Sequence, residues 1–525
     1  MKKKFFFSLT IILSFLLLGF FLSVNTGISH DESHEQYNWI NNLEAYKSIF
    51  GFGDYNKLLD YGDKYHGVSF QLISQPIQYL IYNLVSLITE STLYASYLLS
   101  KHFVVFSIFL FSAFYFNRIC FFISRSKAFS RYSTLLYFFY PYLLGHSLIN
   151  PKDTPFLVFW LITTYYFLKI LKQIYFDQII SLKNILKLSF FSAFLISIRI
   201  SGFLIIIEFI VGLLVLLSIK ENFFLTFLKK NIKNLIYFLI IFLITLFALN
   251  PIFWNGPIEI FNSLKYMSKY FNNVCTLTLG KCERSLDLSP NYYFIWLFFK
   301  LPIICLCGII MFPFVEKKII VKNFTLLIFL TLIISSLSII FLFILQKVAI
   351  YDEIRHIMFI IPLILIPSFY NIYLFSKKIF LFFVFSSLIL FTLDNFKLYP
   401  YQYTWLNEFS KFYDIDKNFE IDYWGTSNKA LQKKIIEMEI NKKISNEICV
   451  FGDGYTNAYL EKKGFSCFGT YNQIDALKKR PFVAYQNLRN LKRNDPYNCN
   501  LVHEENYRYF FSKQAVTTGK VWYCY

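Results

Sequence analysis

Apolar residues recur along this chain in runs of roughly 20, and short charged stretches separate the runs. About 20 apolar residues is the length that an α-helix needs to cross the hydrocarbon core of a bilayer. The pattern therefore predicts an α-helical polytopic membrane protein with about 11 transmembrane helices. The predicted spans are 5–24, 102–122, 130–149, 154–171, 185–200, 203–219, 234–253, 291–313, 323–345, 356–375 and 379–396.

The apolar segment 70–89 is predicted not to cross the membrane. Polar residues and a proline interrupt it at Gln71, Gln75, Pro76, Gln78 and Asn83. Counting it as a span would also invert the charge distribution of every later loop. We predict an interfacial or re-entrant helix within a first outer loop, 25–101.

The basic residues indicate the orientation. Lys and Arg are concentrated at 2–4, 125–131, 169–187, 220–233 and 317–322, which this topology places in the cytoplasm, and they are fewer in the short outer loops. The positive-inside rule then places the N-terminus in the cytoplasm and the C-terminal segment outside. The predicted location is the cytoplasmic membrane. The candidate active site, whose residues are named below, and the C-terminal domain are predicted to be extracytoplasmic.

The cysteines agree with this orientation. Of the nine cysteines, an even-numbered set falls in the predicted outer segments, where disulfides can form: Cys275, Cys282, Cys449, Cys467, Cys499 and Cys524. Their pairing cannot be read from the sequence, and free thiols are an equal alternative.

The composition excludes several classes of protein. Of the 525 residues, 56% are hydrophobic and 16% are charged, whereas a soluble protein carries about 25% charged residues. A soluble enzyme, a disordered chain and a fibrous repeat are therefore excluded. The net charge of +19 would indicate nucleic-acid binding in a soluble protein, but the cytoplasmic Lys and Arg explain much of it, and we predict no nucleic-acid partner.

Candidate chemistry begins directly after the first span, where Asp31 and Glu32 form a carboxylate pair. At the membrane surface, Asp31 could act as the general base for an incoming hydroxyl group. The neighbouring His30, His34 and Glu35 could add metal ligands, but their spacing matches no metal motif. The alternative is an acidic loop start that is merely solvated.

Charged residues also interrupt the apolar pattern at three other outer positions. Lys152 and Asp153 lie between two prolines at the start of a span, where charged irregular backbone must be buried or line a cavity. Arg199 and Arg355 lie at the outer ends of spans and could bind phosphate through their planar guanidinium groups. A hairpin ion pair and side chains that extend to the interface are the alternatives. Glu208 is an intramembrane carboxylate, which is either functional or paired with another helix.

Aromatic residues follow the last span. Tyr and Trp residues within 399–405 are typical of an interfacial belt. That explanation does not cover the later segment 422–427, which reads Asp-Tyr-Trp-Gly-Thr-Ser.

Together these motifs resemble a known family. The ordered set is Asp31-Glu32, Asn150–Phe156, Arg199–Gly202, Arg355-His356, Tyr399–Tyr403 with Asn407-Glu408, and Asp422–Ser427. Over residues 1 to about 430 it resembles the bacterial membrane glycosyltransferases related to the protein O-mannosyltransferases (family 39-like), in the glycosyltransferase C superfamily.

The resemblance implies transfer of a sugar from a polyprenyl-phosphate donor to an acceptor hydroxyl of a glycan, lipid or protein. It implies an inverting reaction on the outer face of the cytoplasmic membrane, with Asp31 as the general base. The remaining catalytic candidates are Glu32 and Asp153. The candidates for substrate binding are Lys152, Arg199, Arg355, His356, Tyr401, Asp422 and Trp424. Some members of the superfamily use a divalent metal, but the sequence commits no ligand set to one.

A transporter or flippase of a lipid-linked anion is the alternative function. Such proteins show paired halves with helices broken at the membrane midplane, and the sequence has no internal repeat.

The chain divides into a transmembrane domain, 1–396, and a C-terminal domain, 397–525. In the latter the pattern predicts a helix over 428–445 and strands over 448–451, 482–485 and 521–523. These elements indicate a small extracytoplasmic α/β domain of about 100 residues, which can bury a core of its own.

Overall fold

The computed structural model describes residues 2–177, 179–220, 224–269, 273–320, 323–452, 457–470, 481–487, 496, 498–510, 512 and 514–525. Its α-helices are α1 (Lys2–Val24), α2 (His30–Ser48), α3 (Asn56–Leu59), α4 (Ser69–Thr89), α5 (Leu93–Ser124), α6 (Lys127–Phe139), α7 (Pro141–Ser147), α8 (Asp153–Asp177), α9 (Leu182–Ile198), α10 (Ile205–Ile219), α11 (Phe224–Leu249), α12 (Ile258–Lys269), α13 (Pro290–Lys300), α14 (Ile303–Ile310), α15 (Phe312–Ile320), α16 (Asn323–Leu345), α17 (Ile361–Phe375), α18 (Lys377–Leu398), α19 (Ile415–Asn418), α20 (Asn428–Ile440) and α21 (Ala458–Lys462).

Short 3-10 helices and strands complete the fold. The 3-10 helices are η1 (Ile200–Leu204), η2 (Pro251–Asn255), η3 (Arg355–Ile360), η4 (Gln402–Thr404) and η5 (Glu408–Phe412). The strands are β1 (Cys275–Thr278), β2 (Lys281–Arg284), β3 (Cys449–Gly452), β4 (Phe468–Thr470), β5 (Phe482–Asn487), β6 (Cys499–Tyr507) and β7 (Val516–Cys524).

The chain is a mostly helical, multi-pass membrane protein. Each predicted span coincides with a helix or with a consecutive helix pair. Within the described residues, seven helices are long and apolar enough to cross a membrane, or eight if one bent pair is a single span. The predicted number of 11 is not confirmed.

Local breaks and short helices explain the difference in number. Within the described residues, the first predicted span contributes only the shorter apolar helix Thr10–Val24. The predicted span 291–313 is divided into α13 and α14, which meet at an angle of 114° next to Pro302. The span 130–149 is divided into α6 and α7 by Pro141, because proline cannot donate the backbone hydrogen bond that a continuous helix needs. Helix α9 has only 17 residues.

Helix α4 occupies the segment that was predicted to be interfacial. It is not among the candidate spans of the described residues. Its buried side includes Gln71, Gln75 and Gln78, whereas Leu80 and Leu87 are 82% and 80% exposed. A helix with a polar buried side and an apolar exposed side is compatible with the membrane interface, and this placement stays a prediction.

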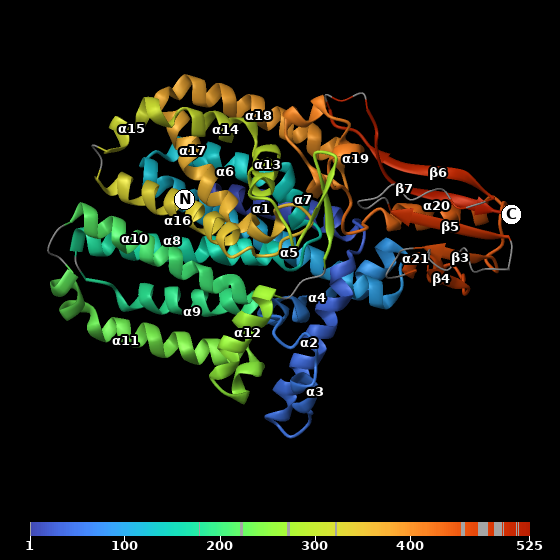
Figure 1. The fold of residues 1–525 in the computed structure, drawn as a ribbon, viewed down its shortest axis with the longest axis horizontal. Helices are drawn as coiled ribbons and strands as arrows, with labels where there is room; N and C mark the ends of the chain where they lie inside the picture. The colour runs from blue at the N-terminus through green and yellow to red at the C-terminus, as the bar shows by residue number, and fades with distance from the viewer. Residues whose placement is uncertain are drawn as a thin grey trace.

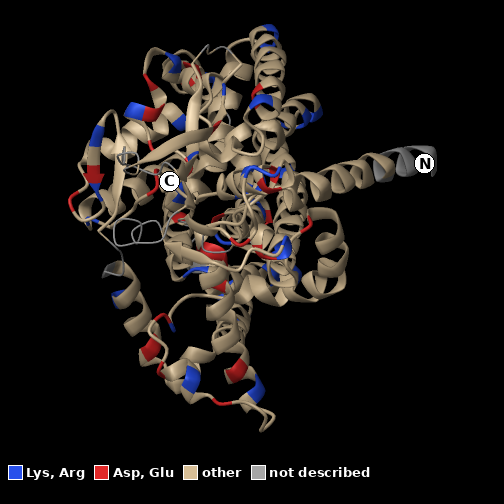
Figure 2. Ribbon diagram, turned by 90° about the vertical axis from the view of Figure 1, so that its right-hand side faces the viewer, with Lys and Arg blue, Asp and Glu red and all other residues tan. Residues whose placement is uncertain are grey.

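The long helices lie side by side, and the C-terminal sheet lies at one end of the bundle (Figure 1). Helices α2, α7 and α12 lie toward that same end, whereas the end of α10 and the start of α11 lie at the other. Seen from the side of the sheet, acidic and basic residues gather near the middle of the molecule as well as at its rim (Figure 2).

The C-terminal domain is α/β, as the sequence predicts. Its mixed sheet has the order β4-β3-β5-β7-β6, in which β3 is parallel to β4 and β5, and β7 is antiparallel to β5 and β6. The predicted helix is α20, and the three predicted strands are β3, β5 and β7. Leu431 and Ile435 of α20 pack with Val450, Val483 and Val521 of the sheet, so the domain has a core of its own.

All the cysteines predicted to lie outside are paired. The disulfides are Cys275–Cys282, Cys449–Cys467 and Cys499–Cys524. The remaining thiols, Cys120, Cys305 and Cys307, lie in helices of the bundle. This division agrees with an oxidising compartment on the side of the sheet.

The predicted orientation can be tested by cysteine labelling in intact cells, in a Cys307→Ser background. Ala128 and Asn441 are both exposed, and the predicted topology places them on opposite sides of the membrane. A membrane-impermeant maleimide should label Asn441→Cys in intact cells and Ala128→Cys only after permeabilisation. The reverse pattern would contradict the topology.

Candidate functional site

The carboxylates of Asp31 and Glu32 lie in the first turn of α2 and have different environments. Glu32 points inward: one of its oxygens accepts a hydrogen bond from the backbone N–H of Ser29 at 2.6 Å. Its other oxygen lies 2.9 Å from Nε2 of His102, and both side chains are fully buried. Asp31 points the other way and is 50% exposed. Glu32 therefore fixes the start of the helix, and Asp31 is presented to the solvent side.

Arg355 lies at the centre of the charged cluster. Its Nη1 is 3.4 Å from a carboxylate oxygen of Asp31 and 3.2 Å from one of Asp153. Its Nη2 is 3.2 Å from a carboxylate oxygen of Asp352. One buried guanidinium group thus joins α2, α8 and the segment before η3.

Asp153 is held from several sides. It is the first residue of α8, where the helix dipole favours a negative charge. Asn150 accepts a hydrogen bond from the Asp153 backbone N–H at 2.8 Å and donates to its carboxylate at 3.1 Å. Arg199 forms an ion pair with the second oxygen, opposite Arg355. Asp153 is 2% exposed, so it is a paired, buried carboxylate.

Lys152 has different partners from Arg199 and Arg355. Its Nζ lies 2.6 Å from a carboxylate oxygen of Glu35 and 3.2 Å from Nδ1 of His66. Burial and the charge of Lys152 hold the pKa of His66 well below its usual range, so this imidazole is neutral at physiological pH.

The segment 422–427 places an aromatic ring over the cluster. The indole N–H of Trp424 donates to Asp31 at 3.3 Å, and the Arg355 guanidinium lies 5.4 Å from the ring centre. Asp422 is fully buried and accepts from the backbone N–H of Thr426 at 2.9 Å and of Ser427 at 3.1 Å. Burial raises the pKa of Asp422, whereas these hydrogen bonds oppose the increase. Asp422 therefore shapes the turn that carries Trp424.

Gly425 shows how closely this turn approaches α2. Its φ of +68° is in the region that favours glycine, and a Cβ there would lie 2.4 Å from Nε2 of His30. A Cβ at Gly27 would likewise lie 2.1 Å from the carbonyl oxygen of Thr426.

A second buried network lies behind Arg355, and it was not predicted from the sequence. Glu353 lies 2.5 Å from Nζ of Lys300 and accepts a hydrogen bond from the Tyr423 hydroxyl at 2.6 Å. Nε2 of His146 is 3.8 Å from the same carboxylate. A charge within an apolar span was the available signal for Lys300, but its partner lies more than 50 residues away in sequence.

Not every candidate joins the cluster. The Tyr401 hydroxyl donates to Glu505 at 2.9 Å, so Tyr401 lies at the contact with the C-terminal domain. His356, by contrast, lies beside the cluster: it packs against the ring of Tyr351, 4.8 Å between ring centres, and interacts electrostatically with Arg355 and Asp153. Glu208 accepts hydrogen bonds from Trp160 and Thr164, both at 3.0 Å.

The three residues considered as metal ligands from the sequence do not come together. Glu35 binds Lys152, and His30 packs against Gly425. Within the described part of the chain, a different group brings possible metal ligands within 4.8 Å of one another: His34, Asp63 and His66.

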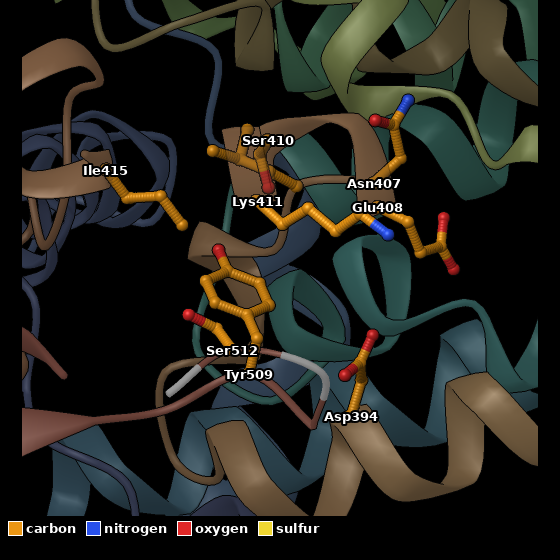
Figure 3. Close-up of a pocket in the computed structure, with 9 residues that line it drawn as sticks. Asp394, Asn407, Glu408, Ser410, Lys411, Ile415, Tyr509 and Ser512 are labelled. Carbon is orange, nitrogen blue, oxygen red and sulfur yellow. The ribbon is translucent and has the colours of Figure 1, made fainter. Parts of the chain in front are cut away.

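A small cavity lies elsewhere, between α18, the segment after η4 and the C-terminal domain (Figure 3). Asp394, Glu408, Lys411 and Tyr509 are among its lining residues. None of the site residues predicted from the sequence lines it, and Asp394 accepts a hydrogen bond from the Trp405 indole at 2.8 Å. The cavity therefore lies apart from the charged cluster.

Comparison with solved structures gives distant structural likenesses. No family model and no curated protein matches the sequence. Two of the similar structures are those of ArnT from Cupriavidus metallidurans, in the apo state (10% identity, TM-score 0.49) and bound to undecaprenyl phosphate (10% identity, TM-score 0.45). Each match covers 98% of this chain and 97% of the other. Likenesses this distant assign no activity, and the relation to the protein O-mannosyltransferases stays a prediction.

The turn at Gly425 gives a stability prediction. Gly425→Ala should lower the melting temperature of the detergent-purified protein, because the left-handed backbone alone costs about 1–2 kcal/mol and the new methyl group would displace His30. Gly62→Ala is the matched control, since a Cβ at Gly62 would meet nothing within 4 Å. Equal melting temperatures for the two variants would show that the close approach is unimportant.

Proposed function

We propose that this protein is a membrane glycosyltransferase that moves a sugar from a polyprenyl-phosphate donor to an acceptor hydroxyl on the outer face of the cytoplasmic membrane. The observation that carries the proposal is the half-exposed carboxylate of Asp31, 3.4 Å from the buried guanidinium of Arg355. Such a transfer needs a base for the acceptor and a cation for the departing phosphate. Here the two groups are adjacent at one end of a helical bundle.

The environments of the three carboxylates favour Asp31 as the base. Glu32 is fully buried against His102. Asp153 is buried and paired with two arginines. Asp31 is 50% exposed, so an acceptor hydroxyl can reach it.

In the proposed reaction, Asp31 removes the proton from the acceptor hydroxyl as that oxygen attacks the anomeric carbon. The bond between the anomeric carbon and the phosphate oxygen breaks, and its electron pair stays on the phosphate. A phosphate leaves without strong acid catalysis when cations stabilise its charge. A single displacement of this kind inverts the anomeric configuration, as in one-step glycoside hydrolysis.

Arg355 and Arg199 are the cations that we assign to the phosphate, because arginine binds phosphate oxygens in a bidentate manner. Asp153 holds both guanidinium groups in place. Lys152, which binds Glu35, is assigned a supporting role. Trp424 positions Asp31 through its indole N–H, and Asp422 positions Trp424.

The base assignment can be tested with Asp31→Asn. The amide keeps the size of the side chain but cannot take a proton, so transfer should fall about 10²–10⁴-fold. The donor is first identified by mass spectrometry of the lipids that co-purify with the protein, and its conversion to free polyprenyl phosphate is then followed in membranes. The amount of co-purifying donor should be unchanged.

Asp153→Asn and Glu32→Gln are the comparison variants for the base. If Asp31→Asn transfers at the wild-type rate while Asp153→Asn is inactive, the base has been assigned to the wrong carboxylate. If Asp31→Asn and Asp153→Asn are both fully active, the proposed function is wrong.

The phosphate assignment can be tested at Arg199, which is 20% exposed and therefore tolerates replacement better than the more buried Arg355. Arg199→Ala should reduce donor retention and cost about 2–4 kcal/mol of transition-state stabilisation. Arg199→Lys should restore only part of this, because lysine lacks the planar fork. Arg118→Ala, an exposed arginine in α5, is the control. Wild-type retention and turnover in Arg199→Ala would exclude Arg199 from the site.

A further inference from the structure

A cluster of metal-ligand type lies beside the candidate site, between α2 and the turn that follows α3. Nε2 of His34 is 3.4 Å from one carboxylate oxygen of Asp63. Nε2 of His66 is 4.0 Å from the other oxygen of Asp63. The two imidazole rings lie edge to face, 5.5 Å between their centres. Three side chains from two segments thus converge on one point.

We propose that His34, Asp63 and His66 bind one divalent transition-metal ion of the Zn²⁺ type. Two imidazoles and one carboxylate, with water in the fourth position, form a ligand set that zinc accepts. With bonds of about 2.0–2.1 Å, ligand atoms of a tetrahedral zinc site lie about 3.4 Å apart. The His34–Asp63 separation already has this value. Nε2 of His66 lies 4.0 Å from the other oxygen of Asp63 and must move closer to bind the same ion.

The burial of the cluster supports a site rather than a surface ion pair. The side chains of Asp63 and His66 are 20% and 13% exposed, whereas that of His34 is 41% exposed. The ion would therefore be accessible to solvent on the side of His34, and the more buried Asp63 and His66 would bind it on the opposite side. Nitrogen ligands favour Zn²⁺ over Mg²⁺ and Ca²⁺, which prefer oxygen.

Bound metal would connect the first outer loop to the candidate site. It would fix the turn at 60–66 to α2, one helical turn beyond Asp31. Metal on Nε2 of His66 also requires the ring proton to be on Nδ1, which lies 3.2 Å from Nζ of Lys152. Lys152 would then keep Glu35 as its partner and lose the contact with His66.

The test is metal binding by the full-length protein, purified in detergent through an affinity tag that contains no histidine. The wild-type protein should retain about one zinc ion per chain by elemental analysis. After removal by a chelator, Zn²⁺ should raise the melting temperature, whereas Mg²⁺ at the same concentration should not. Co²⁺ should give the visible absorption of a tetrahedral site.

Asp63→Asn and His34→Ala should each weaken zinc binding by more than the roughly 10–100-fold that loss of an outer hydrogen-bonding partner costs. Both side chains are partly exposed, so both variants should fold. Asp60→Asn is the matched control, an exposed carboxylate in the same turn that is not part of the cluster, and should bind zinc as the wild type does.

Two results would overturn the proposal: no stabilisation of the wild-type protein by Zn²⁺, or equal stabilisation of the wild type and Asp63→Asn. The second would indicate adventitious binding elsewhere on the chain. Because the measurement is binding and not sugar transfer, its outcome is independent of the proposed function.

Discussion

The candidate site depends on the buried guanidinium group of Arg355. It contacts Asp31, Asp153 and Asp352, which are far apart in sequence and lie on three separate segments. A charge in an apolar interior is tolerated only when opposite charges and hydrogen bonds compensate for its lost hydration. The same requirement acts on the buried carboxylates of Asp153 and Asp352, so neither of their segments can move away without leaving an uncompensated charge. The ion pairs of Arg355 therefore hold three segments together: the start of α2, the start of α8 and the segment before η3.

A second layer of contacts holds Arg355 at this point. Asp352 and Glu353 have φ values of 54° and 63°, which non-glycine residues adopt only when the surrounding structure compensates for the strain. The compensation is visible at Glu353, which binds Lys300 and Tyr423. Tyr423 is also the neighbour of Trp424, whose ring lies beside Arg355. The strained turn and the aromatic segment thus support the same guanidinium group from two directions.

The sequence predicts the helices and strands well, but it predicts poorly which side chains form ion pairs with one another. Apolar runs of bilayer length predict helices because hydrocarbon imposes one length and one kind of backbone pairing. The same argument misses the bend next to Pro302, since a broken span and a straight one have equal composition. Isolated charges in apolar surroundings pointed to Asp153, Arg199 and Arg355, and the structure brings these together. The sequence could not show that Glu353 pairs with Lys300, because two partners that are distant in sequence leave no local pattern.

The geometry also connects the two halves of the proposed reaction. Asp31 and Asp153 share one nitrogen of Arg355, at 3.4 Å and 3.2 Å. Asp153 is buried and paired with both Arg199 and Arg355, so it keeps the guanidinium group of Arg355 in place. In the proposed reaction, Asp31 would lose its negative charge on taking the acceptor proton, and its attraction for the shared nitrogen would then disappear. The N–H group of Arg355 that Asp31 had bound would then be free to bind the departing phosphate as the phosphate gains charge. One arginine between two unlike carboxylates would thereby couple deprotonation of the acceptor to stabilisation of the leaving group.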